Sequence, residues 1–352
     1  MNRIIKLNIN KIIKNIASLT IFTLFIVGLI SSFSCKGEKA PGEIDWNKVI
    51  EFVPLEEREG FGEKDQIFEP IEITLLHTND TRGNIQPCGW NPRQGGVARR
   101  ATVIREIESQ KENVIILDAG SALYGHYDTE YSKGEIMIKF MNLLGYDAIS
   151  LGSMDFKYKM DEILDLNDKA EFPILSANLV SKQDKSLVFD AYTIIESSGR
   201  NIAIIGISPY PLEESSESDI IEKYETIDPI EAINKIIDDL RLKANIIIVL
   251  SSAGREIDEK IAKSIDAVDI IVAGSSNQIT MQPVVIEREE KSDALIVESQ
   301  VLGKKLGKLI VKFSSVGKIK EFEGELLKLD PEVEDDPEIA KILKEYLEQM
   351  KK

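Results

Sequence analysis

Residues 71–84 read IEITLLHTNDTRGN, an apolar run that changes abruptly into a polar turn. The apolar part, residues 71–77, has the β-branched and aliphatic composition of a buried strand. The part that follows contains Asn79, Asp80 and Gly83, residues that favour turns. Because α/β proteins usually build their sites where strands end, we expect functional side chains in this turn.

Downstream of this stretch, strand and helix patterns alternate. Apolar residues recur at helical spacing in residues 96–108, 134–144, 229–242 and 256–265. Short apolar runs predict strands at residues 113–118, 148–151, 172–177, 201–207, 245–250 and 269–273. Residues 284–322 have a strand-and-turn pattern without long helices, and residues 337–352 form an amphipathic helical pattern. The order predicts an α/β fold.

Composition excludes several classes of protein. The chain has 352 residues, of which 43% are hydrophobic and 29% charged, so it is neither disordered nor a disulfide scaffold. The formal net charge of −17 argues against sequence-independent binding of nucleic acid, which needs a cationic surface. Only two His and two Cys occur, so a site built on several His or Cys ligands is impossible.

The turns after the predicted strands carry a recognisable series of motifs. In order, they are HTNDTRGN at 77–84, GGVARR at 95–100, LDAGS at 117–121, GYDA at 145–148, LGSMDF at 151–156, FPILSAN at 172–178, LSS at 250–252 and VAGSSN at 272–277. This series resembles the bacterial 5'-nucleotidase family of metallophosphoesterases, which has the calcineurin-like fold. The resemblance extends from about residue 71 to residue 322.

The resemblance implies both an architecture and a chemistry. It implies a four-layer α-β-β-α sandwich of two mixed sheets, here over residues 71–328. It also implies two divalent metal ions, bridged by a carboxylate, that polarise phosphate and generate a hydroxide nucleophile. Family members that act on nucleotides usually continue into a C-terminal domain that grips the base. We do not expect that domain here.

Position by position, the motifs depart from the ligands that the resemblance implies. Asp80 keeps the Asp of the first motif, whereas the other seven positions hold different side chains. These are Arg82 for a His, Ser121 for the bridging Asp, Ser153 for an Asn, Met154 for a His that assists the leaving group, Ser252 for a His, and Ser275 and Asn277 for two His. Neutral hydroxyls and a thioether are poor ligands for hard divalent ions, so no metal cofactor is expected.

Two alternatives concern the charged residues that remain. Asp80, Asp118 and Asp155 could form a weak carboxylate site for one ion such as Mg²⁺ or Ca²⁺. Arg82 is expected to pair with Asp80, because an isolated buried carboxylate is unfavourable and a guanidinium could fill the volume that the metals vacate. Alternatively, Arg82 is left free to bind an anionic ligand.

Neither His offers a replacement site. His77 is expected to be a packed core residue, and His126 a surface residue without a ligand-spaced partner. Cys88 is expected to be a buried, unreactive thiol, or else to pair with another chain.

The first 34 residues have the pattern of a secretory signal. Four basic residues precede an uncharged stretch from residue 15 to residue 34 with a dense apolar core. Cys35 follows small residues and resembles the lipidated Cys of a bacterial lipoprotein; an uncleaved anchor helix is the alternative. Residues 35–70 are expected to be an acidic tether or a partly ordered arm, and residues 329–352 a C-terminal helix.

These features predict a non-catalytic lipoprotein of the cell envelope, held at a membrane by its lipid anchor. It would bind or scaffold an unidentified envelope protein or a small anionic ligand, and not nucleic acid. The alternative is a metal-dependent phosphoester hydrolase, similar to a 5'-nucleotidase, with a rearranged site.

Overall fold

A computed structural model describes residues 69–212, 216–275, 281–288 and 292–351. The predicted signal, the lipidation position Cys35, nearly all of the acidic segment and the former ligand position Asn277 lie outside these ranges. Within them, no helix combines the length and apolar character needed to cross a bilayer.

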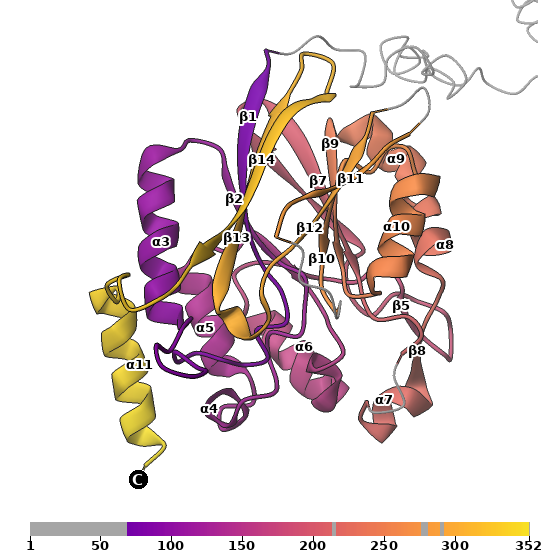
Figure 1. Ribbon diagram of the computed structural model, residues 1–352. Helices are drawn as coiled ribbons and strands as arrows, with labels where there is room; N and C mark the ends of the chain where they lie inside the picture. Colours follow the sequence, from indigo (N-terminus) through magenta and orange to yellow (C-terminus); the bar gives the residue numbers. More distant parts are fainter. Residues whose placement is uncertain (1–68, 213–215, 276–280, 289–291, 352) are drawn as a thin grey trace, which may run out of the picture. The chain divides into compact units, whose positions relative to one another are not determined.

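Two six-stranded mixed sheets form the centre of the domain (Figure 1). The first sheet has the order β14-β13-β1-β2-β3-β4, in which β1 to β4 are parallel and β13 and β14 are antiparallel additions. Its strands are β1 (Ile71–Thr78), β2 (Val114–Asp118), β3 (Ala148–Ser150), β4 (Ile174–Leu175), β13 (Lys305–Phe313) and β14 (Ile319–Lys328).

The second sheet has the order β11-β12-β10-β9-β7-β6, with a parallel centre and an antiparallel strand at each edge. Its strands are β6 (Tyr192–Ser197), β7 (Arg200–Ile207), β9 (Ile246–Ser251), β10 (Ile270–Ala273), β11 (Val284–Ile286) and β12 (Ala294–Glu298). A separate antiparallel pair joins β5 (Leu179–Ser181) to β8 (Tyr224–Thr226).

Helices cover the outer faces of the two sheets. On the side of the first sheet lie α3 (Val97–Gln110), α5 (Glu135–Leu143), α6 (Met160–Lys169) and α11 (Pro337–Gln349), as Figure 1 shows. On the side of the second sheet lie α8 (Pro229–Asn234), α9 (Ile237–Lys243) and α10 (Arg255–Ser264). Shorter pieces are α4 (Tyr127–Glu130), α7 (Ser218–Lys223) and the 3₁₀ turns η3 (Asp155–Lys157) and η4 (Val301–Gly303).

Strand alternation explains why the sheets pack in this way. On β1, Ile73 and Leu75 face the second sheet and share a core cluster with Ile204 of β7 and Ile248 of β9. The intervening Leu76 points the other way, into the cluster formed with the helices. The two sheets are therefore packed face to face between helical layers, which confirms the predicted four-layer α/β sandwich.

One helix prediction was wrong. Residues 229–242 form two helices, α8 and α9, separated by Lys235 and Ile236. Ile236 has φ −119°, outside ordinary helical values, although its apolar spacing continues the pattern of α8. Ile233 and Ile237 on either side of the break are both buried in the same cluster, so both short helices pack on the second sheet.

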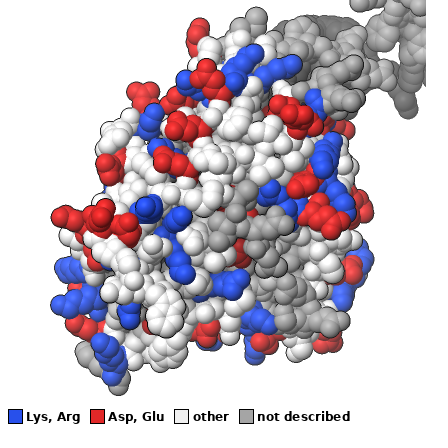
Figure 2. Space-filling view, viewed as in Figure 1, with Lys and Arg blue, Asp and Glu red and all other residues white. Residues whose placement is uncertain are grey.

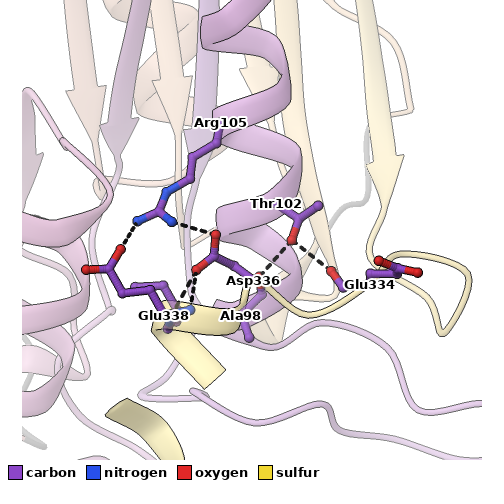
Figure 3. A network of polar contacts seen from close by, with 7 residues as sticks. Ala98, Thr102, Arg105, Glu334, Asp336 and Glu338 are labelled. Carbon is purple, nitrogen blue, oxygen red and sulfur yellow. Dashed lines mark hydrogen bonds and ion pairs between the residues drawn. The ribbon is translucent and has the colours of Figure 1, made fainter. Parts of the chain in front are cut away.

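The C-terminal helix α11 is joined to α3 by a polar network (Figure 3). Arg105 binds Asp336 at 2.5 Å and Glu338 at 2.8 Å. Asp336 also caps α11 by accepting from the N–H groups of Glu338 and Ile339, which satisfies donors that a helix start otherwise leaves free. Further bonds run from Thr102 Oγ1 to the carbonyl of Glu334 and from the Asp336 N–H to the carbonyl of Ala98.

Candidate functional site

The turns that follow β1 and β2 run side by side and continue the pairing of the two strands. The N–H of Asp80 donates to the carbonyl of Gly120 at 2.9 Å, and the N–H of Arg82 donates to the carbonyl of Ser121 at 2.8 Å. The HTNDTRGN and LDAGS motifs are thus held together by backbone bonds. This arrangement places their side chains at the carboxyl end of the first sheet, as the sequence predicted.

Backbone conformation marks four of the former ligand positions. Asp80 has φ 48°, Arg82 φ 49°, Ser121 φ 57° and Ser275 φ 56°. Residues other than Gly rarely adopt these left-handed values, which cost on the order of 1–3 kcal/mol each. Such strain clusters at functional sites, and no pattern of residue types in the sequence indicated it.

The fold also brings the later motifs to the same place. The N–H of Ser275, which follows β10, donates to Asp80 Oδ2 at 2.8 Å. The N–H of Met154 donates to Ser121 Oγ at 3.4 Å, and Ser252 Oγ donates to the carbonyl of Ala119 in the LDAGS motif. Ser153 is half-buried beside Met154. The structure therefore gathers the described former ligand positions from both sheets.

Two glycines allow the motif loops to approach so closely. A Cβ at Gly152 would lie 2.2 Å from Ser121 Oγ, and a Cβ at Gly120 would lie 2.6 Å from Ser252 Oγ. Gly120 also has φ 100°, a conformation that other residues avoid. The loops are closely packed on one another.

The carboxylate of Asp155 is hydrogen-bonded to the backbone of these loops. Its Oδ2 accepts from the N–H groups of Ser121 and Gly152, and its Oδ1 accepts from the N–H of Leu123, each at 2.8 Å. Burial raises the pKa of Asp155 to about 6, against the lowering effect of these bonds.

Asp118 and Asp80 are hydrogen-bonded in a similar way. Asp118 accepts from Thr78 Oγ1 at 2.6 Å and from the N–H of Gly120 at 2.7 Å, and burial raises its pKa to about 7. Asp80 Oδ2 accepts from the N–H of Ser275 and, at 2.9 Å, from Asn79 Nδ2. Each carboxylate thus meets its own set of donors.

This donor set does not fit a shared metal ion. Among the described residues, no three or more His, Cys, Asp or Glu side chains are arranged to hold a metal. The carboxylates accept from N–H and O–H donors, and the neighbouring hydroxyls of Ser121 and Ser252 carry no charge. The arrangement gives no support to a one-ion site on Asp80, Asp118 and Asp155.

Arg82 does not form the expected pair with Asp80. Arg82 is exposed, whereas Asp80 is buried, and no ion pair joins them. A Cβ at Gly125 would lie 3.1 Å from both Arg82 Cβ and Met154 Cε, so Arg82 stands at the rim of the site beside Met154. The expected pairing was wrong: Asp80 accepts its hydrogen bonds from Asn79 and Ser275 in the buried part of the site, whereas Arg82 is exposed.

A buried cation was missed by the sequence analysis. Arg100 of α3 is fully buried and donates from Nη1 to Tyr146 Oη at 3.4 Å. Tyr146 is in turn bonded to Thr78, the partner of Asp118. No spacing rule distinguishes Arg100 from its neighbour Arg99, which is half-buried and binds the carbonyls of Arg93 and Leu329.

The two His and Cys88 have structural roles in the described domain. Burial lowers the pKa of His77 to about 3, which keeps this core residue neutral and agrees with the expected packing role. His126 is the N-cap of α4 and accepts from the N–H of Asp128. Cys88 is half-buried, with Sγ 3.9 Å from the carbonyl oxygen of Leu302.

Comparison with known proteins gives a consistent result. No family model matches the chain. The chain is 32% identical over 296 residues to a snake venom 5'-nucleotidase of Gloydius brevicauda, covering 76% of this chain and 50% of that protein. It is 30% identical over 297 residues to the 5'-nucleotidase of Bos taurus, covering 77% of this chain and 51% of that protein. The chain thus spans about half the length of these relatives.

Solved structures agree with the sequence relatives. A 5'-nucleotidase precursor from Thermus thermophilus superposes with a TM-score of 0.71 at 27% identity, over 80% of this chain and 59% of that one. A calcineurin-like phosphoesterase from Bacillus subtilis superposes with a TM-score of 0.67 at 21% identity, over 80% of this chain and all of that one, and supports the fold alone. The described residues therefore form a domain of the 5'-nucleotidase family with the metallophosphoesterase fold.

Proposed function

We propose that this protein is a non-catalytic member of the 5'-nucleotidase family that binds or scaffolds a partner in the cell envelope. One observation carries the proposal. The fold assembles the former ligand positions, yet Ser121, Ser252 and Ser275 stand there, and the remaining carboxylates accept hydrogen bonds from the loops.

The chemistry of phosphoester hydrolysis explains why this observation matters. A two-metal site must stabilise both the attacking and the leaving oxygen of phosphate. Hydroxyl and thioether groups cannot balance the charge of two hard divalent ions, and Asp155 already accepts three hydrogen bonds from backbone N–H groups of the loops. An active hydrolase with a rearranged site is the alternative, supported by the names of the relatives.

A small anion is the ligand that the site would accommodate best. Arg82 is exposed at the rim, and among the described residues it forms no ion pair with Asp80. A guanidinium in this position could bind a carboxylate or phosphate group in a bidentate manner. On the face drawn in Figure 2, positive and negative side chains are interspersed, without the continuous basic stripe typical of nucleic-acid binding.

Export and lipid anchoring at Cys35 complete the proposal. The basic flank and apolar core of residues 1–34 support export, and so does the similarity to 5'-nucleotidases of snake venom. A lipid on Cys35 would hold the domain at a membrane surface through the acidic segment that follows.

The test compares the natural protein with a variant in which the ligands of the family are restored. Both would be assayed for hydrolysis of a nucleoside monophosphate and of p-nitrophenyl phosphate with Mn²⁺, Mg²⁺ or Zn²⁺. The restored variant carries Arg82→His, Ser121→Asp, Ser153→Asn, Met154→His, Ser252→His, Ser275→His and Asn277→His. We expect no metal-dependent turnover by the natural protein. Turnover that chelation abolishes and a divalent ion restores would overturn the proposal.

A further inference from the structure

We propose that the Arg100 guanidinium is a fixed internal cation that balances the buried carboxylate of Asp118, so that the site keeps its charge balance without a metal ion. This inference builds on the proposed function, because it explains how a metal-free site of this family stays folded. The sequence analysis expected Arg82 to supply the positive charge that replaces the metals. Here that charge is assigned to Arg100.

Burial makes the position of Arg100 unusual. Its side chain is 0% exposed, and it is one of the largest fully buried side chains among the described residues. Removing a guanidinium from water is strongly unfavourable unless an opposite charge or a full set of hydrogen bonds compensates for it. A compensating group must therefore lie near Arg100.

Hydrogen bonds to Arg100 are too few to provide that compensation. Within the described residues, only Nη1 has a partner, Tyr146 Oη at 3.4 Å, whereas Nε and Nη2 have none. Opposite charge must then supply most of the compensation. The short series of bonds from Arg100 leads to that charge.

A series of hydrogen bonds runs from Arg100 in α3 to Asp118 in the LDAGS motif. Tyr146 Oη lies 3.0 Å from Thr78 Oγ1, and Thr78 Oγ1 donates to Asp118 Oδ2 at 2.6 Å. Asp118, Thr78 and Tyr146 are all buried. Burial raises the pKa of Asp118 most, the bonds from Thr78 and Gly120 lower it, and the charge on Arg100 lowers it by the smallest of these effects, which agrees with a guanidinium that reaches Asp118 through Tyr146 and Thr78.

The fold also leaves space for this guanidinium. A Cβ at Gly303, in the turn before β13, would lie 2.4 Å from Arg100 Nη2. Gly303 has φ 60°, so both its conformation and its missing side chain suit the position. The turn at Gly303 therefore leaves room for the guanidinium of Arg100 in its buried position.

The test is a double-mutant cycle measured by chemical denaturation at pH 8, where Asp118 is ionised. The variants are Arg100→Met, which keeps the volume and removes the charge, Asp118→Asn, and the two together. We expect Arg100→Met to raise the unfolding equilibrium constant at least tenfold. Each single change leaves the opposite charge buried without its partner, whereas the double change removes both charges. The increase in the unfolding equilibrium constant of the double variant should therefore be about tenfold or more smaller than the product of the two single increases.

A matched control and a rescue separate charge from packing. Arg99→Met, combined with Asp118→Asn, removes a neighbouring guanidinium that binds elsewhere and should give independent effects. Arg100→Lys restores the charge with a poorer shape. It should be more stable than Arg100→Met if charge matters, and no more stable than Arg100→Met if Arg100 only fills space.

Independent effects of Arg100→Met and Asp118→Asn would overturn the inference, as would equal stability of the Lys and Met variants. If Arg100→Met does not fold, Tyr146→Phe takes its place in the cycle, because it removes the hydroxyl between Arg100 and Thr78. Coupling of Tyr146→Phe to Asp118→Asn is then expected, and its absence contradicts the inference. These are folding measurements, so their failure is distinct from any finding of metal or hydrolysis.

Discussion

Asp155 should act as an anchor for the site loops, and its replacement should therefore destabilise the whole domain. The carboxylate is 1% exposed and accepts from three backbone N–H groups, those of Ser121, Leu123 and Gly152, in the loops of the site. Asp155→Asn keeps one oxygen, which can satisfy the two donors at Oδ2, but it turns an NH₂ group toward the N–H of Leu123. Asp155→Ala removes all three acceptor contacts.

The magnitude follows from this count of bonds. A hydrogen bond to a charged group contributes about 1.5–3 kcal/mol, and a buried donor left without a partner costs about 1–3 kcal/mol. One lost bond predicts a decrease of about 2–3 kcal/mol in the free energy of unfolding for Asp155→Asn. Three lost bonds, less the desolvation cost that the carboxylate no longer incurs, predict about 4–6 kcal/mol for Asp155→Ala, which is a large part of the stability of a typical domain.

Urea denaturation at pH 7.5 measures both values, with Asp161→Asn as the matched control. Asp161 is exposed at the start of α6, so its replacement should change stability by less than about 0.5 kcal/mol. A decrease of less than about 1 kcal/mol in the free energy of unfolding for both Asp155 variants would show that Asp155 does not anchor the loops. The carboxylate would then remain available as a ligand.

Three further predictions concern other parts of the protein. Burial raises the pKa of Asp258 to about 8, above its value in the unfolded chain, so its contribution to stability is lost as pH rises through about 8. Asp118, with a pKa of about 7, and His77, whose pKa in the unfolded chain is about 6.5, also contribute between pH 6.5 and 8, so the natural protein is compared with Asp258→Asn. Over this range the free energy of unfolding should fall by about 1–2 kcal/mol more in the natural protein than in the variant; the same pH dependence in both would contradict the prediction. Arg105→Ala should cost about 1 kcal/mol, because the ion pairs are partly exposed, and should speed hydrogen exchange in α11, whereas unchanged exchange there would show that apolar packing alone holds the helix. Cys35→Ala should abolish labelling by a fatty-acid analogue and leave the protein unprocessed, and membrane retention with an unchanged mass in both proteins would favour an anchor helix.

The α/β class and the burial of the strands could be predicted from the sequence, whereas the four-layer sandwich followed from the resemblance to the metallophosphoesterase fold. Continuous apolar runs such as β7 and β9 are typical of strands covered on both faces, and all six residues of β9 are buried. The polar turns after β1 and β2 then had to meet at one sheet edge. Order and spacing along the chain were sufficient to predict the alternation of strands and helices and the position of the polar turns.

Charge pairing in the site could not be predicted in the same way. Arg82 is two residues from Asp80, and this closeness in sequence suggested a pair, but Asp80 is buried and Arg82 is exposed. Arg100 is adjacent to Arg99, yet one is fully buried and the other is not. Which of two neighbouring residues enters the core depends on helix rotation and on the shape of distant turns such as the one at Gly303, and residue types alone do not encode either.

The most direct test of a metal-free site is the metal content of the purified domain. The protein would be incubated with excess Mn²⁺, Zn²⁺ or Fe²⁺, dialysed, and analysed for metal, with the restored-ligand variant treated in parallel. We expect a negligible fraction of an equivalent of each metal in the natural protein and a clearly higher metal content in the restored variant. One or more equivalents retained by the natural protein would contradict this expectation.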